Sequence, residues 1–191
     1  MTDRETKLQG KSVAILATHG FEESELIEPQ DELSRAGATV HIIAPQSGTI
    51  RAWDVDKWGG EVNVDKTVAD ANPDDYDALV LPGGVLNPDQ LRMREDVTSF
   101  IRAFFKAGKP VSAICHGAQT LIDCGVLEGR TVTSYPSIKL DLKNAGARWT
   151  DQEVVVDQGL TTSRTPDDLP AFIDNTIEEI LEGKHAAQAT A

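Results

Sequence analysis

The stretch PVSAICHG at residues 110–117 decides the fold. Residues 110–114 form a short apolar run typical of a buried strand, and a helix is predicted to begin at about His116. Cys115 then occupies the tight turn between them, which is the layout of a nucleophile elbow. Such a turn requires small flanking side chains, and Ala113 and Gly117 meet that requirement. We therefore expect the Cys115 sulfur at the carboxyl edge of a sheet.

The same alternation of buried strands and amphipathic helices extends along the chain in both directions. It predicts a mostly parallel sheet with helices on both faces, in one domain over residues 11–182 with flexible ends at 1–10 and 184–191. The predicted strands cover 12–17, 39–44, 78–81, 131–133, 153–156 and 160–163, and the predicted helices 25–36, 97–107 and 169–181.

Residues 45–65 interrupt this alternation and contain Trp53 and Trp58. They are expected to form an irregular or hairpin excursion over the sheet edge. This excursion is either a structural flap or a wall of a pocket or subunit contact.

Charge and composition exclude several classes of partner. The chain has 191 residues with 31 acidic and 18 basic side chains, giving a net charge of −13. Such a surface repels phosphate backbones and anionic lipid, so we expect neither nucleic acid nor membrane as a partner. No apolar run approaches the ~20 residues of a membrane helix, and the N-terminus lacks a signal-peptide core. A cytoplasmic location is expected.

The two cysteines have different expected roles. Cys115 and Cys124 are nine residues apart, which turns them to opposite faces of one helix, so neither a disulfide nor a zinc site is expected between them. Cys124 is assigned to packing. Cys115 at a helix N-terminus would have a lowered thiol pKa, although an inert buried cysteine is the alternative. His116 follows it directly and can serve as general acid and base; the other candidate site histidine is His19.

Two further segments are expected near this sulfur. Gly84 and Val85 end the strand at 78–81, where their backbone N–H groups could stabilise an oxyanion; a plain strand-end turn is the alternative. An acidic loop follows the first strand, and in a doubly wound sheet it lies beside those strand ends. A carboxyl there would have its pKa raised by a thiolate and could donate a hydrogen bond to sulfur, unless these residues only interact with a helix dipole. The acidic residues are Glu22, Glu23, Glu25 and Glu28.

Together these residues resemble the PfpI intracellular-protease-like family, within the class I glutamine amidotransferase-like superfamily. The resemblance covers about residues 11–182 and implies a flavodoxin-like fold with a nucleophile at Cys115. It further implies that Glu25 hydrogen-bonds the sulfur and that His116 is the neighbouring histidine. The matching motifs are GFEESEL (20–26), YDALVLPGG (76–84), GKPVSAICHG (108–117) and TSRTPDDLPAF (162–172).

The resemblance also implies a shared active site and a set of backbone donors. In protease-like members an acidic residue from an adjacent subunit completes a triad, and Asp89 stands at that position where the family has Glu. Self-association, as a dimer or a larger oligomer, would then be needed for activity. The family's backbone donors correspond to Gly84, Val85 and His116, and no cofactor or metal is implied.

Three functions share this site. The first is a cysteine enzyme acting on small reactive carbonyls or glycated groups, the second an intracellular cysteine peptidase, and the third a redox sensor or chaperone that oxidises Cys115. Glutamine amidotransfer is excluded because it needs a downstream histidine, and after His116 the chain has only His185.

Overall fold

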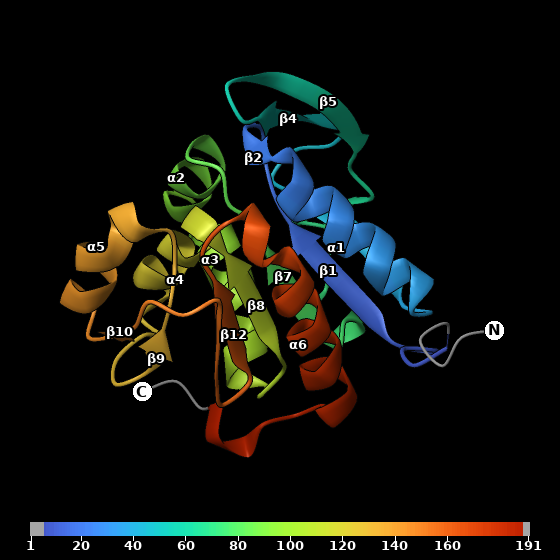
Figure 1. Ribbon diagram of the computed structural model, residues 1–191. Coiled ribbons are helices and arrows are strands. Elements are labelled where there is room, and N and C mark those ends of the chain that lie inside the picture. The colour runs from blue at the N-terminus through green and yellow to red at the C-terminus, as the bar shows by residue number, and fades with distance from the viewer. Residues whose placement is uncertain (1–5, 189–191) are drawn as a thin grey trace.

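A seven-stranded sheet forms the centre of the computed structural model, which describes residues 6–188. All neighbouring strands are parallel except the outermost pair, β11 and β12 (Figure 1). The predicted doubly wound α/β class is therefore confirmed. In spatial order the strands are β11 (Val154–Asp157), β12 (Leu160–Ser163), β8 (Val111–Ile114), β7 (Ala78–Leu81), β1 (Ser12–Leu16), β3 (Thr39–Ala44) and β6 (Lys66–Thr67).

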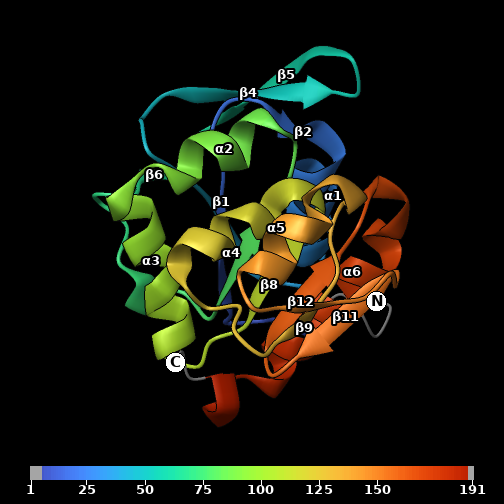
Figure 2. The ribbon, with the colours of Figure 1, turned by 90° about the vertical axis from the view of Figure 1, so that its left-hand side faces the viewer.

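Helices cover both faces of this sheet. α1 (Glu23–Arg35) and α6 (Leu169–Glu182) lie on one face, and α3 (Glu95–Lys106) and α4 (Gln119–Cys124) on the other (Figures 1 and 2). The shorter α2 (Leu86–Arg92) and α5 (Lys139–Asn144) lie on the α3 side. Residues 13–16 of β1 alternate between the two cores and are fully buried, which explains the uninterrupted apolar run of this strand.

The excursion at residues 45–65 is a hairpin of β4 (Thr49–Asp54) and β5 (Lys57–Asn63), as predicted. It stands beyond the end of β1, and β4 pairs there with β2 (Phe21–Glu22) (Figure 1). The Trp53 and Trp58 rings pack edge to face, with centroids 5.5 Å apart. The predicted strand at 131–133 is β9 (Thr131–Val132), which pairs with β10 (Arg148–Trp149) in a separate sheet.

At the ends of the chain, where flexible segments are expected at 1–10 and 184–191, two described residues make buried contacts. Leu8 is fully buried, and its backbone N–H donates to the Ala36 carbonyl at 2.8 Å. At the other end Gln188 is fully buried, and its carbonyl accepts from the Arg130 guanidinium at 2.9 Å. The buried Leu8 side chain thus anchors the N-terminal segment, and the buried Arg130 anchors the C-terminal segment. The polar sequences of these two segments did not indicate either contact. Residues 1–5 and 189–191 lie outside the described part of the chain.

None of the helices within residues 6–188 is long and apolar enough to cross a membrane.

Candidate functional site

The bend after β8 places Cys115 in a strained backbone conformation. Its φ is 60°, a left-handed value that non-glycine residues rarely adopt. Cys115 opens a 3₁₀ turn, Cys115–Ala118, which leads into α4. A Cβ atom at Gly117 would overlap the carbonyl oxygen of Leu81, so only glycine fits there. The structure thus has the strand–turn–helix layout of an elbow, tightened by close backbone packing.

The Cys115 sulfur lies among hydrogen-bond donors from three segments. The backbone N–H groups of His116 and Gly84 donate to it, and the Glu25 carboxyl is its side-chain partner. His116 Nδ1 lies 3.3 Å from Sγ. The sequence-predicted residues Cys115, His116, Glu25 and Gly84 therefore come together at the carboxyl ends of β8, β7 and β1.

Gly83 lies between the carboxyl and the sulfur. Its N–H donates to Glu25 Oε2 at 2.8 Å. A Cβ atom at Gly83 would lie 2.6 Å from that oxygen and 2.7 Å from the Cys115 Cβ. The close approach of Glu25 to the sulfur consequently depends on the missing side chain at residue 83.

Burial controls the protonation of the Glu25 carboxyl. Glu25 is fully buried, and burial raises its pKa to about 8 even though the Gly83 N–H lowers it. The carboxyl is therefore mostly protonated at neutral pH. Its Oε1 makes no other hydrogen bond, so an O–H there is free to donate to sulfur.

The resting thiol of Cys115 differs from the sequence-based expectation. Burial raises the pKa of Cys115, and negative charge on Glu25 raises it further, while the N–H groups of His116 and Gly84 oppose the shift. We expected the helix N-terminus to lower this pKa. The side chain is only 6% exposed, and desolvation outweighs the dipole of a short 3₁₀ turn. Protonation of Glu25 removes its charge and favours the thiolate.

His116 has two neighbours that the sequence analysis missed. Its Nε2 lies 3.0 Å from Ser137 Oγ, and its ring stacks on Tyr135 with centroids 4.6 Å apart. Burial lowers the pKa of His116, so the imidazole is neutral and can accept a proton. Nothing in the sequence indicated Tyr135 or Ser137 as neighbours of His116, because they lie about twenty residues after the elbow and belong to no recognisable motif.

Asp89 and Val85 make no hydrogen bond to Cys115 within the described residues. Asp89 is exposed on α2, and within residues 6–188 no hydrogen bond or ion pair joins it to His116. Val85 precedes α2 and is 62% exposed. The buried Asn87 between them accepts from the Thr18 N–H at 2.7 Å and donates to the Pro82 carbonyl at 2.9 Å. Asn87 thereby ties the loops after β1 and β7, a role that the sequence analysis did not assign.

Two of the remaining candidates, His19 and Glu23, form hydrogen bonds to the hairpin. His19 Nδ1 accepts from the Arg51 N–H at 3.0 Å, so His19 supports β4 and not the sulfur. Glu23 Oε2 accepts from the Gly60 N–H at 2.7 Å. Glu23 and Glu25 both belong to the first turn of α1.

Comparison with known proteins places this arrangement in a family. Residues 11–179 match the DJ-1/PfpI family. The chain is 48% identical over 164 residues to protein/nucleic acid deglycase 2 of Escherichia coli strain K12, covering 85% of this chain and 93% of that protein. It is 47% identical to general stress protein 18 of Bacillus subtilis strain 168, with 85% and 94% covered. The crystal structure of Drosophila melanogaster DJ-1beta superposes with a TM-score of 0.82 at 31% identity, covering 90% of each chain.

Proposed function

The chain belongs to the DJ-1/PfpI family, and on that premise we propose that it is a cysteine-dependent stress-protection enzyme whose Cys115 attacks reactive carbonyls or glycated groups. The observation that carries the proposal is the environment of the sulfur. Two backbone N–H groups and the Glu25 carboxyl surround Sγ, and a neutral imidazole lies 3.3 Å away. This combination stabilises a thiolate during reaction and supplies a base beside it.

The chemistry follows from these contacts. His116 accepts the thiol proton, and the sulfur adds to an aldehyde carbon, whose oxygen takes that proton to give a hemithioacetal. With an α-oxoaldehyde, His116 moves the C–H proton to the adjacent carbonyl carbon by way of an enediol, which leaves a thioester. Water cleaves the thioester, releasing the hydroxy acid and regenerating the thiol. With a glycated amine in which the aldehyde carbon carries the nitrogen and a hydroxyl, the sulfur displaces the nitrogen. His116 passes the thiol proton to the leaving amine, and the same hemithioacetal remains.

The restricted access to Cys115 favours small substrates. A sulfur on a residue only 6% exposed suits a small carbonyl compound or a modified side-chain tip better than a folded polypeptide. A peptidase triad would need an acidic partner for His116, and within residues 6–188 its Nε2 faces Ser137 instead. Peptide hydrolysis by this site would therefore need an acidic partner for His116 from another copy of the chain, and the family resemblance makes Asp89 the candidate.

Self-association and a cytoplasmic location belong to the same proposal. Val85, Leu86 and Met93 are exposed apolar residues on or beside α2, which also carries Asp89. A second copy covering this helix would bury them and bring an acidic side chain close to a neighbouring site. The net charge of −13 argues against nucleic acid and membrane surfaces as partners.

Lactate formation from methylglyoxal tests the proposal. We expect Cys115→Ala to reduce the rate by at least about 1000-fold while circular dichroism shows an intact fold. Cys124→Ala is the matched control, because Cys124 is equally buried but contacts the Thr98 carbonyl and not the site. Full activity in Cys115→Ala would refute the proposal, and cleavage of a fluorogenic peptide without lactate formation would favour the peptidase. An inactive wild type whose Cys115 is readily oxidised would favour the redox sensor.

A further inference from the structure

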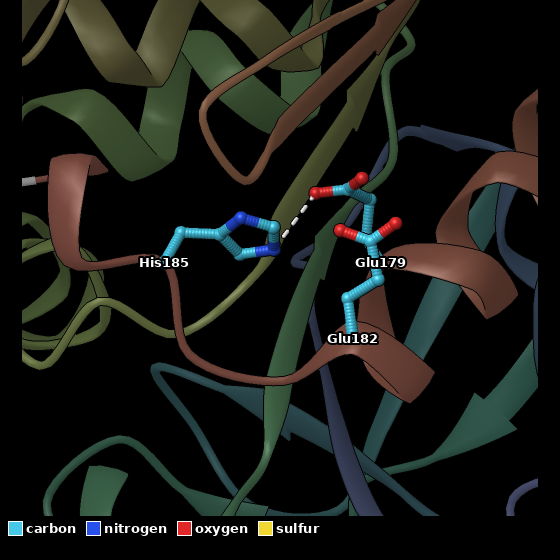
Figure 3. Close-up of side chains that lie close together, drawn as sticks. All are labelled: Glu179, Glu182 and His185. Atoms are coloured by element: carbon cyan, nitrogen blue, oxygen red, sulfur yellow. Dashed lines mark ion pairs between the residues drawn. The ribbon is translucent and has the colours of Figure 1, made fainter.

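A second cluster of ligand-type side chains lies far along the chain from Cys115, at the end of α6. Glu179, Glu182 and His185 each direct one ligand atom into the same space, and these atoms all lie within 4.8 Å of one another (Figure 3). Glu179 and Glu182 are one helical turn apart. His185 returns towards them after Gly183, whose φ of 84° reverses the chain. The cluster thus joins α6 to the C-terminal strap, which we define as residues 183–188.

The contact between Glu179 and His185 is a close ion pair that lacks the geometry of a hydrogen bond (Figure 3). Glu179 Oε2 lies 3.0 Å from His185 Nε2, and the two side chains are only 9% and 18% exposed. Both atoms are buried, yet neither has a hydrogen-bond partner within the described chain. This separation, without hydrogen-bond geometry between two buried atoms, is also the spacing of adjacent ligands on a cation.

The same corner contains a third buried atom without a partner. Gln188 is fully buried, and its Oε1 makes no hydrogen bond. A Cβ atom at Gly159 would lie 2.6 Å from this oxygen and 2.8 Å from Cδ2 of His185, so the amide oxygen and the imidazole approach the same point. Three of the eight unpartnered buried polar side-chain atoms in residues 6–188 therefore belong to Glu179, His185 and Gln188. This concentration separates the corner from an ordinary exposed acidic patch.

The electrostatics of the corner also favour a cation. The Glu179 carboxyl is buried, and a ligand oxygen of Glu182 lies within 4.8 Å of it. A buried carboxylate beside another carboxylate is costly without added positive charge.

We propose that Glu179, Glu182 and His185 form a binding site for a first-row divalent cation of the Zn²⁺ type, which fastens the C-terminal strap to α6. One imidazole and two carboxylates are ligands of this class, whereas Mg²⁺ and Ca²⁺ prefer oxygen alone. Bonds of about 2.0–2.1 Å place tetrahedral ligand atoms about 3.3 Å apart, close to the Glu179–His185 separation. The exposed Glu182 completes the set by rotating its side chain, and water or Gln188 Oε1 takes the fourth position.

Calorimetric titration with Zn²⁺ tests this site in the full chain carrying Cys115→Ala, which removes the competing thiol. We expect one Zn²⁺ per chain, with affinity reduced at least tenfold by Glu182→Gln and by His185→Gln. Glu178→Gln is the matched control, because this exposed carboxylate on α6 carries the same charge but lies outside the cluster; its affinity should change less than twofold. No Zn²⁺ binding, or equal affinities for Glu182→Gln and Glu178→Gln, would overturn the proposal.

Amide hydrogen exchange gives a readout that does not depend on enzyme activity. If opening of the strap releases the metal, Zn²⁺ at 100 times its Kd should slow exchange at His185 and Gln188 about 100-fold. Both amides are hydrogen-bonded, to Gly108 and to His185 respectively, so their protection is measurable without metal. The slowing should vanish in Glu182→Gln and persist in Glu178→Gln. Unchanged exchange on addition of saturating Zn²⁺ would show that the strap is not fastened by metal.

Discussion

Replacing Glu25 by glutamine should change how the stability of the protein depends on pH. The Glu25 carboxyl has a pKa of about 8 in the folded protein and the ordinary value of 4.5 in the unfolded chain. The folded state therefore binds this proton more tightly. The stability that this proton contributes is complete below pH 4.5 and is lost as pH rises to about 8. The loss is about 1.4 kcal/mol per pH unit, which is about 5 kcal/mol over the whole window and about 4 kcal/mol between pH 5 and 8. Glutamine keeps an oxygen for the Gly83 N–H and has no proton to lose.

Urea unfolding followed by circular dichroism at pH 5, 6, 7 and 8 measures this effect. The free energy of unfolding of Glu25→Gln, relative to wild type, should rise steadily across these values by about 4 kcal/mol. Glu28→Gln is the control, because Glu28 is an exposed carboxylate on the same helix. Parallel curves for wild type and Glu25→Gln would refute the reasoning, since they would mean that Glu25 titrates equally in the folded and unfolded chain.

Three further predictions concern the elbow, the histidine and the exposed acid. Gly117→Ala should lower the free energy of unfolding by about 2–4 kcal/mol, because its Cβ would overlap a backbone carbonyl. Gly125→Ala is the control: its Cβ would meet open space at a φ of 67°, so it should lower the free energy of unfolding by only about 1 kcal/mol. Urea unfolding measures both. Ser137→Ala should reduce kcat about fivefold with KM unchanged, since it removes one hydrogen bond to His116; an unchanged kcat would exclude Ser137 from positioning the ring. Asp89→Asn should weaken turnover only if chains associate, so an active monomer by sedimentation analysis would remove Asp89 from the site.

Local patterns in the sequence predict the sheet and the elbow well. The predicted strands at 39–44, 78–81 and 160–163 match the structure to the residue. The first two are mainly apolar runs bounded by turn residues, whereas the third, LTTS, is mostly β-branched and polar. The small residues around Cys115 predict its tight turn, which the structure has.

Features that depend on tertiary packing were not predictable in this way. α2 was not predicted because it is only seven residues long and contains Pro88. The direction of the Cys115 pKa shift depends on burial under side chains from other elements, and Ser137 reaches His116 only through the fold. The C-terminal strap is held by hydrogen bonds to Arg130, Gly108 and Gly159, which a hydropathy pattern does not reveal.

The first turn of α1 has a mechanical consequence. Glu23 accepts a hydrogen bond from the Gly60 N–H in β5 of the hairpin. Two residues later, Glu25 is the carboxyl group that contacts the Cys115 sulfur. A displacement of the hairpin would therefore shift the same helical turn that fixes the position of the Glu25 carboxyl relative to Gly83. Changes in hairpin length or sequence, made far from Cys115, would be transmitted to the reacting atom as a shift of its proton donor.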